Sequence, residues 1–321
     1  MGYKTHDPDY PRPSYRPAVT SPTRRIQRRL ALKRLLVLLI LCIPAYGMAQ
    51  HELLYADWYD SAQVAKKAGA YERAAVHYQQ AFARRTPLAE HAIDAARVHW
   101  LARDTARTQG YVDQALVLGW SGDDLPEDTV LSVYWTQPSS IGSKRLWERY
   151  KAMLMPELKA ELEAMFREDQ DMRMKLDWDK ADSPDSLVRR SVWIPVEAQD
   201  ARHYARVVEI IKEHGVPSVH QVGLTGNKMI FFAFIHAGST ERITPWVVQL
   251  RASVEKGESP ATWYAYVIDR VMVQTTKVTM FGTTGYTDRS DGVTYFTSVL
   301  PDVVDLVREE AGLPRMGRNS W

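Results

Sequence analysis

The chain has 321 residues, of which 45% are hydrophobic and 25% are charged, an ordinary composition for a globular protein of one large or two modest domains. Nine of its 41 basic residues but only two of its 39 acidic residues precede residue 50, so residues 50–321 hold 32 basic and 37 acidic side chains and offer no basic face for nucleic acid. The single cysteine, Cys42, lies in an N-terminal apolar run, which excludes a disulfide or a thiolate metal site from the remainder.

The first 49 residues are predicted to be a disordered basic segment followed by a signal peptide. Residues 1–23 are rich in Pro, Ser, Tyr and Arg and show no periodicity. The positive block Arg24–Arg34 precedes the apolar run Leu35–Ile43, and Gly47–Ala49 then supplies the small residues of a cleavage site. The pattern predicts a periplasmic or secreted bacterial protein. The alternative is an uncleaved signal anchor in the inner membrane, which would be the only membrane contact of the protein.

Residues 50–150 are Ala-rich with helical periodicity, and the stretch after residue 67 resembles one tetratricopeptide repeat. The small residues that would let two antiparallel helices approach closely are Gly69, Ala74 and Ala81. The aromatic residues that would fill the groove between these helices are Tyr71, Tyr78 and Phe82. Pro87 then blocks continuation of the helix and turns the chain.

A weaker second unit follows, with Ala92–Trp100 as its first helix and Asp104–Leu118 as its second. Two units are fewer than the three that a free-standing solenoid usually needs, so we expect them to pack against the rest of the chain. The region is therefore interpreted as either a packing scaffold or a groove that binds a protein or peptide partner. Beyond it, Lys144–Met153 is predicted to be a short helix anchored by Trp147.

The domain predicted over residues 155–321 begins with a long helix, Glu157–Leu176, which Pro156 opens. Its apolar positions follow helical spacing and are Leu158, Leu162, Met165, Met172 and Leu176. Asp169 occupies the missing position of that series, so a carboxylate is predicted to face the core. Arg173 lies four residues further along the same side, within reach of Asp169. The alternative is a surface ion pair in which both side chains turn out to water.

Residues 177–191 are predicted to be a polar loop. Two further helices are predicted before residue 240, with a loop between them. Asp200–His214 is amphipathic and is stopped by Gly215, and Val219–Gly226 is predicted to be the loop. Lys228–Ala237 is apolar on every side and is predicted to be a central buried helix. His236 lies near the end of that helix, where the helix dipole favours its protonated form. It is interpreted as either a satisfied core residue or a catalyst.

A strongly apolar helix, Trp263–Gln274, carries the adjacent charged residues Asp269 and Arg270 in its middle. Charges in such a helix are costly to bury without partners, so this pair is expected to meet other polar residues. Val278–Thr284 and Val293–Leu300 are predicted to form a two-stranded hairpin. The predicted fold is mainly α, with tetratricopeptide-like helical hairpins packed against a helical domain that carries a small β-hairpin.

The order of several short blocks in residues 155–321 resembles a bacterial family known only as a domain of unknown function. The blocks of that family read Asp-Gln-x-x-Arg, His-Ala after an apolar helix, Asp-Arg, Tyr-Gly-Thr-Gln, and Gly-Leu-Pro after an Arg-rich helix. The matching residues here are Asp169–Arg173, His236–Ala237, Asp269–Arg270, Phe281–Thr284 and Gly312–Pro314. The departures from the family pattern are at Ile235, Phe281 and Thr284. The resemblance implies an exported protein with a helical N-terminal part and assigns no reaction.

Two classes of function fit these features. In the first, the protein is an exported cell-envelope module for binding or assembly, its helical hairpins contact a protein, and its buried charges fix the helix packing. In the second, it is a hydrolase- or transferase-like enzyme that acts on a small anionic molecule. The first class is the leading hypothesis. A membrane-anchored sensor is a third interpretation, which requires that the N-terminal segment stays uncleaved.

One set of residues forms the candidate site under the enzyme hypothesis. His236 is the candidate general acid or base, oriented by Asp169 or Asp269. The binding candidates, which would hold an anionic group or bring backbone close to it, are Gln170, Arg173, Arg270, Gly282 and Thr283. No Gly-x-Ser-x-Gly turn supplies a nucleophile, so water or the Thr283 hydroxyl would have to serve. The sequence predicts no cofactor, and no metal site either, because its histidines lack metal-ligand spacing.

Overall fold

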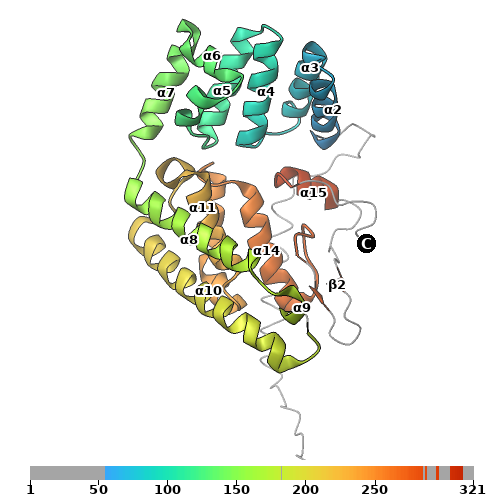
Figure 1. Cartoon of the computed structure of the whole chain (residues 1–321), viewed down its shortest axis with the longest axis vertical. Coiled ribbons are helices and arrows are strands. Elements are labelled where there is room, and N and C mark those ends of the chain that lie inside the picture. The colour runs from blue at the N-terminus through green and yellow to red at the C-terminus, as the bar shows by residue number, and fades with distance from the viewer. Residues whose placement is uncertain (1–54, 182, 285, 288–293, 296–303, 314–321) are drawn as a thin grey trace, which may run out of the picture. The chain divides into compact units, whose positions relative to one another are not determined.

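The computed structural model describes residues 55–181, 183–284, 286–287, 294–295 and 304–313. The chain divides into two compact units, Met1–Glu52 and Leu53–Trp321, and every described residue belongs to the second. These residues are mainly helical, which confirms the predicted fold class at that level (Figure 1). The predicted signal segment lies outside them. Within the described ranges, no helix is both long enough and apolar enough to cross a membrane.

Four helices of similar length open the described part of the chain and pack in pairs (Figure 1). They are α2 (Tyr55–Lys67), α3 (Tyr71–Phe82), α4 (Ala89–Leu101) and α5 (Thr105–Val117). α2 packs on α3, α4 packs on α5, and α3 also contacts α4. Ala62, Ala74 and Ala92 are fully buried in these interfaces, because a methyl side chain lets helix backbones approach closely. Tyr78 is fully buried among them.

Gly69 has a different role from the predicted one. The sequence predicts that it lets two helices approach each other, but it is exposed and lies in the turn between α2 and α3. Its φ is +71°, a conformation that costs other residues more than glycine. Gly69 therefore shapes the turn, and alanines alone bring the helices together.

A group of short helices follows the two pairs. They are the 3-10 helix η1 (Gly122–Glu127), α6 (Leu131–Thr136), the 3-10 helix η2 (Pro138–Ser140) and α7 (Ile141–Lys151). Trp147 of α7 is buried, and its indole nitrogen donates a 3.1 Å hydrogen bond to Asp123. Its ring belongs to a core with Ile93 of α4 and Leu116 of α5. The predicted anchoring role of Trp147 is confirmed.

Three long helices come next. They are α8 (Pro156–Met174), α10 (Ser186–His214) and α11 (Val219–Ile235), with the single-turn α9 (Trp178–Ala181) between the first two. Two predicted loops are therefore wrong, because residues 177–191 contain α9 and the start of α10, and residues 219–226 belong to α11. Pro195 lies inside α10 although proline usually interrupts a helix. Gly223, with φ of +72° and ψ of 169°, is not helical and divides α11 into two helical segments that meet at a kink.

The remaining elements are short, except for one helix. They are α12 (Thr240–Ile243), the 3-10 helix η3 (Thr244–Trp246), α13 (Val247–Glu255), α14 (Ala261–Thr276), β1 (Tyr286–Thr287), β2 (Thr294–Tyr295) and α15 (Val304–Glu310). β1 and β2 pair antiparallel over two residues each. The predicted first strand, Val278–Thr284, is wrong, because this stretch is a bent loop. Most of the predicted second strand, Val293–Leu300, lies outside the described residues.

α11 lies at the centre of a hydrophobic core. The side chains of Met229, Ile230, Phe231 and Phe234 are fully buried there, as predicted for a helix that is apolar on every side. α8 and α14 both pack against α11, and α10 contacts α8 and α11. Polar residues of these four helices are thereby brought into one region beside the C-terminal end of α11.

Two glycines are expected to respond in opposite ways to replacement by alanine. A methyl group at Gly122 would collide with the ring of Trp147, so Gly122→Ala should lower the free energy of unfolding by about 1–3 kcal/mol. Gly110 lies exposed inside α5 with open space beside it, so Gly110→Ala should raise that free energy by about 0.5–1 kcal/mol. Urea denaturation of both variants measures the difference. Stabilisation by Gly122→Ala would contradict the packing described for Trp147.

Candidate functional site

Asp169 of α8 is completely buried and binds three side chains. Its Oδ1 accepts hydrogen bonds from Arg173 Nη1 at 2.6 Å and from His236 Nδ1 at 3.1 Å. Its Oδ2 accepts a hydrogen bond from Gln170 Nε2 at 2.8 Å. The predicted core-facing position of Asp169 is confirmed, and the alternative of a surface ion pair open to water is wrong.

Arg173 joins Asp169 to a second carboxylate, that of Asp200 in α10. Its Nη2 donates to the two oxygens of Asp200 at 2.9 and 3.0 Å. Both carboxylates are shielded from solvent, with 1% of the Asp169 side chain and 14% of the Asp200 side chain exposed. Charge-assisted hydrogen bonds of this kind are strong and directional, so one guanidinium fixes α8 against α10.

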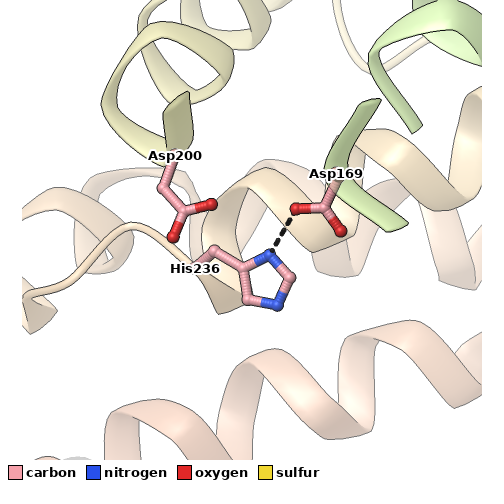
Figure 2. A group of neighbouring side chains, drawn as sticks. All are labelled: Asp169, Asp200 and His236. Atoms are coloured by element: carbon pink, nitrogen blue, oxygen red, sulfur yellow. Dashed lines mark hydrogen bonds and ion pairs between the residues drawn. The ribbon is translucent and has the colours of Figure 1, made fainter. Parts of the chain in front are cut away.

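His236 follows α11 directly and lies between the two carboxylates, as Figure 2 shows. An ionised carboxylate can only accept hydrogen bonds, so the Nδ1 atom of His236 carries the proton that it shares with Asp169. Nε2 lies on the far side of the ring and points away from Asp169 (Figure 2). The side chain is 20% exposed. In the neutral ring, Nε2 is therefore a proton acceptor that solvent can approach.

The contacts of Asp169 keep it ionised. Burial by itself raises the pKa of the carboxyl group, but the hydrogen bond and charge of His236 and the charge of Arg173 hold that pKa below its ordinary value. The ionised carboxylate is therefore a hydrogen-bond acceptor for Nδ1, and Asp169 orients the ring of His236.

Asp169, Asp200 and His236 also have the composition of a metal site, because one ligand atom from each lies within 4.8 Å of the others. The guanidinium of Arg173 bonds to both carboxylates, however, and shares Asp169 Oδ1 with His236. A metal ion at these oxygens would meet the full positive charge of Arg173 at close range. The cluster is therefore organised around an arginine, and a metal ion would have to displace it.

Arg270 of α14 lies close enough to Asp200 to interact with its charge. Its Nε is buried without a hydrogen-bond partner, and within the described ranges its guanidinium forms no ion pair. Burial lowers the pKa of Arg270, and the charge of Asp200 opposes that shift. A buried cation without a paired anion is costly. The guanidinium of Arg270 is therefore able to bind an anionic group of a ligand.

Asp269, the neighbour of Arg270, is fully buried in a separate set of contacts. Its carboxylate accepts backbone hydrogen bonds from Met280 at 2.7 Å, Phe281 at 3.0 Å and Thr283 at 2.7 Å. The Thr283 hydroxyl donates a fourth hydrogen bond at 2.8 Å. Burial raises the pKa of Asp269, and these four hydrogen bonds oppose the shift. Asp269 thus ties the loop after α14 to the helix itself.

The predicted site residues fall into two groups. Those that hydrogen bonds join in one cluster are Asp169, Gln170, Arg173 and His236. Arg270 is linked to this cluster through the charge of Asp200. The residues of the loop contact are Asp269, Gly282 and Thr283, where Gly282 adopts a φ of +62° in the turn. The structure shows no hydrogen bond between the two groups among the described residues.

Asp200 is the site residue that sequence reasoning missed. The sequence places it at the start of a helix, whereas α10 begins at Ser186 and carries Asp200 in its interior. Buried Val196 and Val207 stand four positions before and seven positions after it, so Asp200 continues an inward-facing series. The same signal that identified Asp169 would have identified Asp200 in a correctly bounded helix.

Comparison with models of protein families, with curated proteins and with solved structures finds no match for this chain. The resemblance to a bacterial domain of unknown function therefore stays a prediction. The site has to be interpreted from its own geometry.

The Asp269 contact is expected to be structural. Asp269→Ala leaves three backbone N–H groups and one hydroxyl without their acceptor, so the free energy of unfolding should fall by about 3–5 kcal/mol. Thr283→Val is the matched control, because it removes one hydroxyl and keeps the backbone donor, and it should cost about 1 kcal/mol. Chemical denaturation measures both. Similar losses for the two variants would mean that the backbone hydrogen bonds to Asp269 contribute little.

Proposed function

We propose that the protein is an exported, hydrolase-like enzyme in which His236 transfers a proton and Arg270 holds an anionic group of a small substrate. The observation that carries the proposal is the mostly buried guanidinium of Arg270, whose Nε has no hydrogen-bond partner among the residues that the structure describes. It belongs to the same cluster as a histidine that a buried carboxylate orients. An unsatisfied cation near an oriented acid–base group suits catalysis on an anion better than it suits helix packing.

His236 is placed to act as a general base through Nε2. Asp169 accepts the Nδ1 hydrogen, which leaves a lone pair on Nε2, and its charge stabilises the imidazolium formed after proton transfer. The Thr283 hydroxyl already donates to Asp269, so water is the better nucleophile. His236 would take one proton from water as the water oxygen bonds to the substrate. The same proton would pass to the leaving group as its bond to the substrate breaks.

The charges of the cluster suit an anionic substrate. Asp169 and Asp200 carry two negative charges, and Arg173 and Arg270 carry two positive ones. Protonation of His236 would therefore make the cluster positive overall. Arg173 is engaged by two carboxylates, so Arg270 is the guanidinium that remains for a phosphate, sulfate or carboxylate group.

A binding or assembly module is the second candidate function, and the helix pairs favour it. The order and lengths of α2 to α5 are compatible with tetratricopeptide-like hairpins. The side chains of Val64 in α2 and Val76 in α3 are 67% and 52% exposed, and exposed apolar residues suit a protein or peptide partner.

Export is part of both proposals. An intact N-terminus on protein recovered from the bacterial envelope, in place of one that begins near Gln50, would argue for the uncleaved anchor.

Turnover of small phosphate, sulfate and carboxylate esters is the direct test of the enzyme proposal. His236→Asn keeps an amide that can donate to Asp169 but lacks Nε2, so it should lower kcat at least about 100-fold while the melting temperature changes little. His214→Asn is the matched control on α10, where His214 faces only an exposed glutamate, and it should leave kcat unchanged. Failure of the wild-type protein to hydrolyse any ester class would count against the enzyme and favour the binding module.

The two arginines of the cluster are expected to differ in their effect on stability. Arg270→Met removes a buried charge without a partner, so the free energy of unfolding should stay constant or rise by about 1 kcal/mol. Arg173→Met leaves two carboxylates facing each other, so that free energy should fall by about 3 kcal/mol. Titration with phenyl phosphate should show affinity reduced about tenfold or more in Arg270→Met. A large loss of stability in Arg270→Met would instead assign it a structural role.

A further inference from the structure

Lys228 of α11 is surrounded by aromatic rings from three helices. Its Nζ lies 4.8 Å from the ring centroid of Phe166 in α8, 5.1 Å from that of Phe232 in α11, and 4.6 Å from that of Trp263 in α14. Three ring faces at these distances attract an ammonium group and hold it in place. The same three helices that pack together at the His236 cluster therefore also fix the position of a second cationic group.

The ammonium group of Lys228 has hydrogen-bonding capacity that the protein does not use. Among the described residues it makes no hydrogen bond and no ion pair, although the charge of Glu90 in α4 acts on it from a distance. An aromatic ring face attracts the charge but accepts no conventional hydrogen bond, so the three N–H groups stay available. The side chain is partly exposed, which makes these donors accessible from solvent.

The aromatic cage connects Lys228 to the candidate site. The ring of Phe232 contacts Lys228 and also packs edge-on against His236, with centroids 5.6 Å apart. The ring of Trp263 contacts Phe232 at 5.6 Å and lies seven residues before Arg270 on α14. His236 follows Lys228 by eight positions, which is about 12 Å along a helix. Phe232 therefore contacts both Lys228 and His236, and Trp263 belongs to the same helix as Arg270.

We propose that Lys228 is a second anion-binding group of this site, so that the substrate carries two negatively charged groups. The inference rests on the proposed function, in which Arg270 binds the first anionic group. The ring of Phe232 links Lys228 to His236, so the ammonium group lies beside the same site. With Asp169 and Asp200 offset by the two arginines, the charge of Lys228 is left for a second anionic group of the substrate.

Matched aromatic acids test the proposal without knowledge of the natural substrate. Isothermal titration at low ionic strength compares benzoate with terephthalate, and biphenyl-carboxylate with biphenyl-dicarboxylate, on the full-length protein. In the wild type, at least one dicarboxylate should bind about tenfold or more tightly than the monocarboxylate with the same rings. Lys228→Met should reduce that ratio to about one and leave monocarboxylate binding unchanged. Lys228→Arg keeps the charge and should keep the preference.

The outcomes separate this inference from the proposed function. If the wild type binds neither dicarboxylate more tightly, or if Lys228→Met retains the preference, Lys228 only packs the helices and the inference is wrong. If Arg270→Met leaves monocarboxylate binding unchanged, the proposed anion site at Arg270 is wrong by itself. If none of the aromatic acids binds the wild-type protein, the result counts against both the inference about Lys228 and the proposed anion site at Arg270. Thermal melting of Lys228→Met shows whether loss of the ammonium group destabilises the packing of the three helices. An unchanged melting temperature means that the binding of wild type and variant can be compared directly.

Discussion

The bridge that Arg173 makes between Asp169 and Asp200 is the interaction on which the candidate site depends. Two carboxylates this close would otherwise repel each other, and one of them would take up a proton. With His236 and this guanidinium beside it, the pKa of Asp169 stays below its ordinary value although the residue is completely buried. Its negative charge in turn selects the tautomer of His236 and directs Nε2 away from the carboxylates. The orientation of the histidine therefore depends on Arg173, with which it forms no hydrogen bond among the described residues.

Asp269 and Arg270 show how neighbouring charges on one helix come to have different roles. Consecutive residues of an α-helix point about 100° apart, so the two side chains meet different parts of the fold. Four hydrogen bonds from the following loop satisfy Asp269, whereas the buried Nε of Arg270 has no hydrogen-bond partner in the described part of the chain. A satisfied buried charge holds structure together. An unsatisfied one costs stability, and a ligand that supplies the missing partner offsets that cost.

The position of Asp169 could be predicted because an interruption in an apolar series is a local property of the sequence. Asp200 carries the same signal, but Pro195 hides it by making the helix around it look shorter than it is. Residues 278–284 contain the valine, threonine and phenylalanine residues typical of a strand, yet they form a loop. Their backbone N–H groups bond to the buried Asp269 carboxylate, and that tertiary contact outweighs a strand propensity worth about 1 kcal/mol or less.

Three features could be predicted from the sequence alone: the chain is mainly helical, the apolar residues after Lys228 form a largely buried helix, and Asp169 faces the core. All three follow from the spacing of apolar side chains, which acts over one or two helical turns. Which charges meet depends instead on the tertiary structure. Arg173 reaches Asp200 across 27 residues, and His236 reaches Asp169 across 67. Contacts between residues so far apart in the sequence are determined by how the helices pack. A local sequence pattern therefore does not predict them.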